Sequence, residues 1–272
     1  MTQEKPLLLL FDGNALVHRA FHAIPPLTIT KTGEPVNAVY GFVLMLLRVL
    51  NDLRPTHYAV AFDYPAPTFR HLEFREYKAQ RPPTPEELRG QFRRVRELVD
   101  AFGIPAYEVE GYEADDILGT ICRQASGEGI DTVIVTGDAD TLQLVSSRVK
   151  VLIPRPGRPF SDTIIYDEDA VRQRYGIEPL QICDLKGLKG DASDNIPGVP
   201  GVGEKTAAKL IQGFGGVDVV YEHIDEVTPE RLQDVLRRNE GLARLSRELA
   251  TIVTDVPITL DLERCLVGGY DR

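Results

Sequence analysis

The sequence predicts an α/β fold with a mostly parallel sheet, followed by a helical subdomain. Three apolar runs of strand length, at 7–12, 58–63 and 132–138, each end in an aspartate. Continuous apolar runs of this length are typical of parallel strands that are covered on both faces, and helical patterns separate them here. The carboxyl ends of the strands line the ligand crevice in open sheets of this class. We therefore expect the acids at these ends to lie close together.

Helical patterns fill the intervals between the strands. The segment 36–53 (VNAVYGFVLMLLRVLNDL) is apolar enough for a largely buried helix, and a second helix follows at 115–125 (DDILGTICRQA). The segment 70–96 is different: it holds eight Arg or Lys against four Glu, and the prolines at 82, 83 and 85 interrupt any helix. We interpret it as two basic helical pieces around a mobile turn. The alternative is a solvated amphipathic helix pair.

The two parts of the chain differ in pattern. Strand-like runs stop near residue 170, and helices with glycine-rich turns follow, centred on 190–207 (GDASDNIPGVPGVGEKTA). We predict a catalytic domain over 1–170 and a helical subdomain over 171–272. The close of the chain, at 254–272, has the pattern of a short strand or an extended tail.

Composition excludes several classes of protein. The chain has 272 residues, 43% of them hydrophobic, which is typical of a globular protein. Its early apolar run at 7–11 is too short to span a bilayer and lacks the layout of a signal peptide, so we expect a cytoplasmic protein without a membrane partner. The three cysteines form no CxxC pair, which disfavours a disulfide framework or a zinc site.

The formal net charge of −10 by itself disfavours a nucleic-acid partner, but the distribution of the charged residues reverses that conclusion. Nine acids stand at strand ends or at neighbouring helix starts: Asp12, Asp63, Glu113, Asp115, Asp116, Asp138, Asp140, Asp191 and Asp194. Removing these nine from the 41 acids leaves 32, against 31 basic residues. The excess negative charge thus belongs mostly to this one set.

The acids predict a site for hard divalent cations. Crowded carboxylates repel one another and raise each other's pKa unless cations intervene, and Mg²⁺ prefers oxygen ligands. The stretch GYEADD at 111–116 places three acids on one helical turn, where two metal ions could share them. Two ions about 4 Å apart can activate water and stabilise the oxygens of a phosphodiester under attack. The alternative for this stretch alone is an over-acidic, solvated helix start.

No other catalytic arrangement is visible in the sequence. It contains no nucleophile elbow, no P-loop and no Cys near a His. His18 and His22 follow Asp12 closely, but hard-metal phosphate chemistry needs no imidazole, so we interpret both as structural.

The stretch GVPGVGEKTA at 198–207 predicts a helix-hairpin-helix that binds the DNA backbone. Glycine-rich turns expose backbone N–H groups to phosphate, and Lys205 and Thr206 add side-chain donors. We expect Gly201 and Gly203 to permit close backbone approach, with a positive φ at Gly203. The alternatives are a plain helix turn and a nucleotide P-loop, and the glycine spacing disfavours the latter.

Six motifs in order carry a resemblance over essentially the whole chain: FDGNAL, AFDYP, YKAQRPPTP, GYEADD, TGDADTLQL and KGDASDNIPGVPGVGEKTA. Together they resemble the flap endonuclease family, in the form of the 5′-nuclease (5′-3′ exonuclease) domain of bacterial DNA polymerase I. The resemblance implies a PIN-like, Rossmann-like core with a helical arch at about 70–96. It also implies a C-terminal helical subdomain with the helix-hairpin-helix.

The resemblance assigns roles to individual residues. Asp12, Asp63, Glu113, Asp115 and Asp116 would surround one metal ion, and Asp138, Asp140, Asp191 and Asp194 the other. Lys78, Arg81, Asp115 and Asp138 would be catalytic. The residues implied to contact DNA are Arg19, Tyr77, Lys78, Arg81, Gly201, Gly203, Lys205 and Thr206. The implied cofactors are two or more Mg²⁺ ions, replaceable by Mn²⁺, and a K⁺ ion at the hairpin.

The sequence therefore predicts a metal-dependent, structure-specific 5′ nuclease that hydrolyses DNA and RNA primers at 5′ ends, nicks and 5′ flaps in replication and repair. We expect a monomer that forms the N-terminal part of a DNA polymerase I. The alternatives are a free-standing bacterial flap endonuclease, a non-catalytic DNA-binding scaffold, and a PIN-type ribonuclease or Mg²⁺ phosphatase. The complete acid set disfavours the scaffold, and the predicted hairpin disfavours the last class.

Overall fold

A computed structural model describes residues 5–155 and 162–268. Within them, six strands form one sheet in the order β3-β2-β1-β4-β5-β6. The first five strands run parallel and β6 pairs antiparallel with β5. The strands are β1 Leu7–Asp12, β2 His57–Ala61, β3 Ala106–Tyr107, β4 Asp131–Val135, β5 Val149–Pro154 and β6 Thr163–Tyr166.

The α-helices of the sheet domain are α1 Gly13–Ala23, α2 Asn37–Leu53, α3 Phe69–Glu73, α4 Glu86–Ala101, α5 Ala114–Gly127 and α6 Glu168–Tyr175. Those of the helical subdomain are α7 Ile182–Lys189, α8 Glu204–Phe214, α9 Val217–Glu222, α10 Glu230–Arg238 and α11 Glu240–Ala250. Three short 3₁₀ helices complete the described part: η1 Ala139–Leu144, η2 Pro179–Gln181 and η3 Ile224–Glu226.

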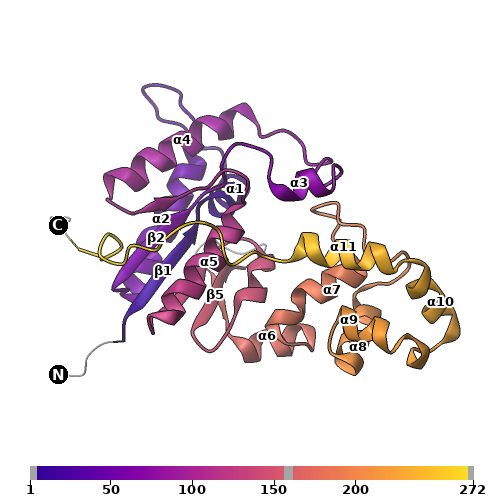
Figure 1. The fold of residues 1–272 in the computed structure, drawn as a ribbon. Coiled ribbons are helices and arrows are strands. Elements are labelled where there is room, and N and C mark those ends of the chain that lie inside the picture. Colours follow the sequence, from indigo (N-terminus) through magenta and orange to yellow (C-terminus); the bar gives the residue numbers. More distant parts are fainter. Residues whose placement is uncertain (1–4, 156–161, 269–272) are drawn as a thin grey trace.

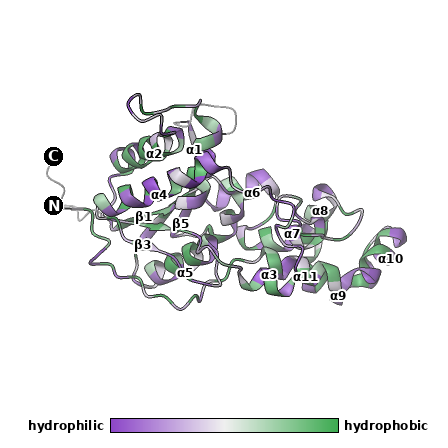
Figure 2. Cartoon of the chain, turned by 90° about the horizontal axis from the view of Figure 1, so that it is seen from above, coloured by the Kyte–Doolittle hydropathy of each residue, from purple (hydrophilic) through white to green (hydrophobic). Residues whose placement is uncertain are grey.

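Alternation along β1 sends side chains to two cores, because successive residues of a strand point to opposite faces. Leu9 and Phe11 pack in one core with α1, α2 and α4. Leu8 and Leu10 pack in the other with α5, and this second core continues into the helical subdomain. Hydrophobic residues concentrate along α2 and around the central strands (Figure 2). Both faces of the sheet are therefore covered, as the continuous apolar runs predict.

The two parts of the molecule lie side by side (Figure 1). The sheet and its helices form one half, α7 to α11 form the other, and α3 lies above the junction. The mostly parallel α/β core with a separate helical subdomain confirms the predicted fold class. No helix in the described ranges has the length and hydropathy needed to cross a bilayer.

Several elements differ in detail from the expectations. The strands β3, β5 and β6 were not predicted, and they lie on the outer sides of the three predicted strands. The expected domain boundary after residue 170 falls inside α6. Within 70–96 the two helical pieces are α3 and α4, separated by turns. The close of the chain is an extended tail with a single bridge between His57 and Leu266, and its residues 269–272 lie outside the described part.

Candidate active site at the carboxyl ends of the strands

The order of the central strands brings three chain segments to one edge of the sheet. β1 lies between β2 and β4, and all three run parallel, so their carboxyl ends meet. Asp12 is the last residue of β1, Asp63 lies two residues beyond β2, and Asp138 lies three residues beyond β4. The convergence that the sequence predicts for these three acids therefore exists in the fold.

Hydrogen bonds fix Asp12 in a buried position. It caps α1 by accepting a hydrogen bond from the backbone N–H of Ala15 (2.9 Å), and its other oxygen accepts one from the Thr136 hydroxyl (2.6 Å). Its residue is 2% exposed. Burial raises the pKa of the Asp12 carboxyl to about 7, and the charges of Asp63 and Asp138 contribute to the rise. A nearby cation would therefore stabilise the ionised form of Asp12.

The start of α5 joins the end of β2. Asp63 accepts a hydrogen bond from the backbone N–H of Ala114 (2.7 Å), and burial raises its pKa. Asp115 faces the same space, because its carboxylate interacts with the charges of Asp138 and Asp12. Burial and then these charges raise the pKa of Asp115 well above its ordinary value. The GYEADD turn thus adds acids to those of the strand ends.

Asp116 lies on the other side of the same helical turn. Its residue is fully buried, and its carboxylate forms a two-bonded ion pair with Arg70, with both N···O distances 2.8 Å. Unlike Glu113 and Asp115, it is not among the residues that line the larger cavity. In the sequence Arg70 is simply one of the basic residues of the arch segment, and its pairing with Asp116 was not predicted.

A second group of acids surrounds Lys186. The ammonium of Lys186 contacts Asp140 and lies 2.5 Å from Oδ2 of Asp191. Asp138 caps η1 by accepting a hydrogen bond from the backbone N–H of Asp140 (2.9 Å), which links this group to the strand end. Burial raises the pKa of Asp140 to about 7, whereas at Asp191 the charge of Lys186 and bonds from Ser193 outweigh burial and lower the pKa to about 2. Sequence reasoning missed Lys186, whose one visible signal is its place five residues before Asp191.

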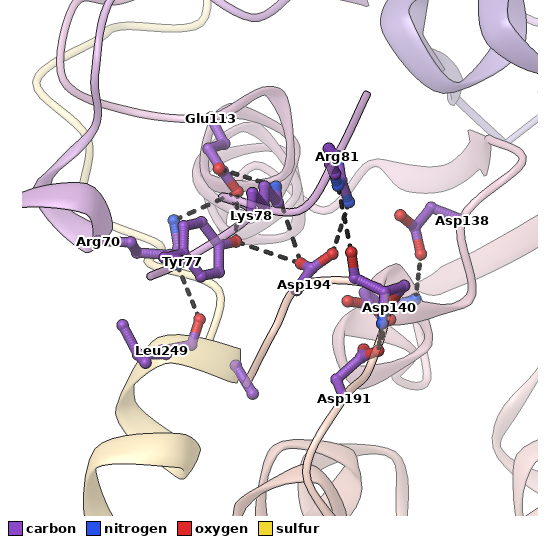
Figure 3. A network of polar contacts seen from close by, with 12 residues as sticks. Arg70, Tyr77, Lys78, Arg81, Glu113, Asp138, Asp140, Asp191, Asp194 and Leu249 are labelled. Carbon is purple, nitrogen blue, oxygen red and sulfur yellow. Dashed lines mark hydrogen bonds and ion pairs between the residues drawn. The ribbon is translucent and has the colours of Figure 1, made fainter. Parts of the chain in front are cut away.

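The turn between α3 and α4 lies over these acids (Figure 3). Lys78 lies 2.8 Å from Glu113, and Arg81 lies 2.5 Å from Asp194. The hydroxyl of Tyr77 lies between the same two carboxylates, 3.1 Å from Glu113 and 3.2 Å from Asp194. Burial, followed by the charges of Glu113 and Asp194, raises the pKa of Tyr77. The residue is 3% exposed, so in this arrangement its ring is not open to a nucleobase.

The backbone ties this turn to the helical subdomain. Lys78 has a left-handed φ of 54°, and its N–H donates to the carbonyl of Asp194 (2.9 Å). The side chain of Asn195, itself at φ 57°, donates to the carbonyl of Glu76 (2.7 Å). Two non-glycine residues in this conformation at one contact indicate that the surrounding structure enforces it.

Two neighbouring cavities contain most of the predicted acids. A cavity of about 600 Å³ is lined by Asp12, Asp63, Glu113, Asp115 and Asp138, with Lys78, Arg81 and Arg19 among its basic residues. A cavity of about 340 Å³ is lined by Asp140, Asp191 and Lys186. His18 and His22 line the larger cavity beside the acids. Within 5–155 and 162–268, no three His, Cys, Asp or Glu side chains are arranged as a ready metal-binding group. Lysine and arginine side chains hold several of the carboxylates instead.

The predicted hairpin consists of α7, the turn 190–203 and α8. Gly201 has a φ of +82°, in the left-handed region, whereas Gly203 has a φ of −90° and caps α8. The expectation of a positive φ at Gly203 is therefore wrong, because an extended N-cap begins the helix there. Open space surrounds both glycines on the Cβ side, and Lys205 is exposed. The hairpin lines one side of the smaller cavity, through Lys186 and Lys189 of α7, Asp191 of the turn and Glu204 of α8.

Comparison with known proteins assigns both parts of the chain. Residues 7–176 match the model of the 5′-3′ exonuclease, N-terminal resolvase-like domain, and residues 177–272 match that of the 5′-3′ exonuclease, C-terminal SAM fold. The chain is 51% identical over 98% of its length to DNA polymerase I of Chloroflexus aurantiacus, and 47% identical over its whole length to DNA polymerase I of Bacillus subtilis. It spans 28% and 30% of the length of these relatives.

Solved structures support the same fold. A crystal structure of the bacteriophage T5 D15 flap endonuclease, in complex with DNA and metal ions, has a TM-score of 0.72 at 22% identity. The similarity covers 90% of this chain and 88% of that one. The catalytic core of Rad2 in complex with DNA substrate has a TM-score of 0.55 at 17% identity, over 87% and 72% of the two chains. With both family models accounting for nearly all of its residues, the chain belongs to the 5′-3′ exonuclease family of nucleases.

Proposed function

We propose that this chain is a Mg²⁺-dependent, structure-specific 5′ nuclease that hydrolyses phosphodiesters at 5′ ends, nicks and 5′ flaps of DNA, and in RNA primers. The observation that carries the proposal is the gathering of five acids from β1, β2, β4 and α5 in one cavity, opposite Lys78 and Arg81. Buried carboxylates with raised pKa values are costly in a purely structural role, so their accumulation favours a cation-binding function.

The donor chemistry of these residues fits Mg²⁺, with Mn²⁺ as a substitute. All candidate ligands are carboxylate oxygens, which hard cations prefer. Asp12, Asp63, Glu113 and Asp115 would hold one ion, and Asp138, Asp140, Asp191 and Asp194 the other. When bound, the two ions supply an activated water and stabilise the oxygens of the phosphodiester. Binding of the second ion requires Lys186 to release Asp140 and Asp191, because its ammonium now occupies them.

The basic residues of the larger cavity would hold the scissile phosphate. Lys78 and Arg81 lie beside the acids on a turn that the helical subdomain fixes, so their positive charges can orient the phosphate and offset its charge. Arg19 lines the same cavity, and we expect it to contact an adjoining phosphate. Contact of Tyr77 with a base requires its hydroxyl to leave Glu113 and Asp194.

The glycine-rich end of the hairpin turn and the start of α8 would bind duplex DNA. Gly201, Gly203, Lys205 and Thr206 present backbone and side-chain donors at the start of α8, and such contacts carry no base information. A K⁺ ion on the turn carbonyls fits the same proposal. We further propose that the chain acts in the cytoplasm as a monomeric N-terminal part of a DNA polymerase I, with replication and repair intermediates as substrates.

The proposal is tested by incubating the chain with a 5′-flap duplex, a blunt duplex and single-stranded RNA, each in Mg²⁺ and in EDTA. We expect cleavage of the flap substrate in Mg²⁺ alone, and loss of cleavage with retained duplex binding in Asp138→Asn. Duplex binding without flap cleavage in Mg²⁺ would indicate a non-catalytic scaffold. A preference for single-stranded RNA would indicate a ribonuclease.

A further inference from the structure

Arg70 connects three parts of the chain from a buried position. It is the second residue of α3, and its side chain is 3% exposed. Its guanidinium donates to both oxygens of Asp116, to the carbonyl of Leu249 (2.9 Å) and to the carbonyl of Thr251 (2.7 Å). Leu249 lies in the last turn of α11 and Thr251 directly follows that helix. Figure 3 shows Arg70 beside Tyr77, with Leu249 and its carbonyl nearby. One side chain thus joins α3, α5 and the end of α11.

The hydrogen-bonding capacity of Asp116 is fully used within the protein. Besides the two bonds from Arg70, it accepts one from the backbone N–H of Glu113 (3.1 Å) and one from that of Val253 (2.9 Å). An ionised carboxylate has about four lone-pair positions, and four donors occupy them here. Asp115 differs, since it lines the larger cavity. Two adjacent aspartates therefore have different environments.

We propose that Asp116 is a positioning residue rather than a metal ligand. Together with Arg70 it forms a clamp, defined as the Arg70 and Asp116 pair with the Leu249 and Thr251 carbonyls. Through α3 the clamp holds the turn that carries Lys78 and Arg81. Through the backbone of Glu113 it holds the start of α5. The end of α11 contributes the two carbonyls of the clamp, so the packing of the helical subdomain affects the geometry of the acid cavity.

The geometry of the ion pair and its burial together make this clamp rigid. A planar guanidinium with two parallel bonds to one carboxylate fixes both distance and orientation, which a lysine cannot reproduce. Removing Arg70 would leave Asp116 as an unpaired buried charge, and removing Asp116 would leave the buried Arg70 with only a longer contact of 3.7 Å to Glu113. Both losses are strongly destabilising. Loss of Asp115 would instead relieve repulsion between buried acids. The two aspartates should therefore respond in opposite ways to the same substitution.

The experiment compares Asp116→Asn with Asp115→Asn in the full chain, by thermal unfolding in EDTA and by Mn²⁺ titration followed by electron paramagnetic resonance. We expect Asp116→Asn to lower Tm by roughly 6 to 10 °C and to keep Mn²⁺ affinity within about threefold of the unmodified chain. We expect Asp115→Asn to keep or raise Tm and to weaken Mn²⁺ binding at least about tenfold. Equal weakening of Mn²⁺ binding by both substitutions would overturn the proposal.

A double-mutant cycle tests the pair itself. Arg70→Met should lower Tm about as much as Asp116→Asn, and adding Asp116→Leu to it should restore part of the loss, because the buried charge that Arg70→Met leaves unpaired is then removed. The rest of the loss should remain, since the backbone groups that the pair satisfied stay without partners. The control is the exposed pair of Arg172 and Glu178, in which Nε of the arginine contacts both carboxylate oxygens, and Arg172→Met should change Tm by about 1 to 2 °C at most. Additive losses in the buried pair would contradict the clamp.

The metal part of this inference rests on the proposed function, and the two can fail separately. If Asp115→Asn binds Mn²⁺ as the unmodified chain does, the proposed metal site is wrong. The clamp is then tested by the Tm of Asp116→Asn alone. A variant that does not fold counts as a loss of Tm. The titration is then made on Arg70→Lys, which keeps the charge, with the same threefold criterion.

Discussion

The ammonium of Lys186 lies 2.5 Å from Oδ2 of Asp191 and also contacts Asp140, so one lysine neutralises two acids from different parts of the chain. Its residue is 6% exposed. The charges of Asp140 and Asp191 outweigh burial and raise the pKa of Lys186, so it remains a cation at neutral pH. A tethered cation at this position competes with any divalent ion for the same oxygens.

Lys186→Met should therefore strengthen divalent binding at Asp140 and Asp191. Removing the ammonium frees both carboxylates and removes its repulsion of a metal ion. We expect Mn²⁺ affinity to rise by about three- to tenfold in calorimetric titration, corresponding to about 0.7 to 1.4 kcal/mol. Lys189→Met is the control, because Lys189 lies close by and pairs with Glu204 rather than with these acids. An unchanged affinity in Lys186→Met would show that the lysine does not compete.

The raised pKa of Asp12 predicts how stability changes with pH in the absence of metal. The folded chain holds this proton up to about pH 7, whereas an unfolded aspartate releases it near pH 4. The folded state thus binds more protons between these values, so its stability falls as pH rises from about 4 to 7 and stays lowered above. Asp12→Asn removes this cost, on the order of a few kcal/mol.

The check is thermal unfolding in EDTA from pH 4 to 8. We expect the Tm of Asp12→Asn to equal that of the unmodified chain at pH 4 and to exceed it by several degrees at pH 8. Asp131→Asn serves as a control because its partner Arg148 and the aspartate itself are largely solvated. A Tm difference that does not grow with pH would mean that ionisation of Asp12 does not lower the stability of the folded chain.

Lys78 and Arg81 should affect turnover more than affinity. Both line the acid cavity, so their charges act where the scissile phosphate would lie. Changing both to alanine should lower the single-turnover rate at saturating flap DNA by at least about a hundredfold, with a much smaller change in Kd. Arg75→Ala, an exposed residue of the same turn, is the control. Equal losses in rate and affinity would make the two residues simple phosphate anchors.

How far the sequence predicts this molecule depends on the range of the interactions. The strands β1, β2 and β4 were predictable because full burial requires continuous apolar runs, and the acids that follow them converge because parallel strands end at one edge. The outer strands were not, since β3 has two residues and the edge strand β6 includes exposed positions.

Long-range pairing was the part that the sequence could not predict. Arg70 lies in a basic segment whose composition is also typical of solvated helices. It nevertheless pairs with Asp116, 46 residues away, and with carbonyls about 180 residues away. The pattern GYEADD likewise groups three acids that the first turn of α5 divides between a cavity and a buried ion pair. Residue type and spacing indicate the chemistry, but the direction of each side chain depends on tertiary packing.

The hairpin should contribute affinity that is independent of the acids. Lys205 is exposed at the start of α8, and a contact with backbone phosphate adds the same free energy whatever the DNA sequence. Lys205→Ala should therefore weaken binding to every flap substrate by a similar factor and reduce the salt slope by about one phosphate contact. Cleavage at saturating DNA should survive. Lys150→Ala is the control, because this exposed lysine lies near the amino-terminal end of β5, at the sheet edge opposite the acids.

The two hairpin glycines separate the fold of the turn from its contact with DNA. At Gly203 the φ of −90° and the open space around a Cβ allow a valine without backbone strain. Gly203→Val should therefore lower Tm only slightly, as a poorer N-cap, and lose affinity because the side chain blocks the approaching DNA backbone. At Gly201 the φ of +82° is unfavourable for a β-branched residue, so Gly201→Val should lower Tm as well as affinity. Binding isotherms at several salt concentrations, with thermal unfolding of each variant, test both statements. If Gly203→Val binds flap DNA with an unchanged Kd and salt slope, the DNA backbone does not approach this turn.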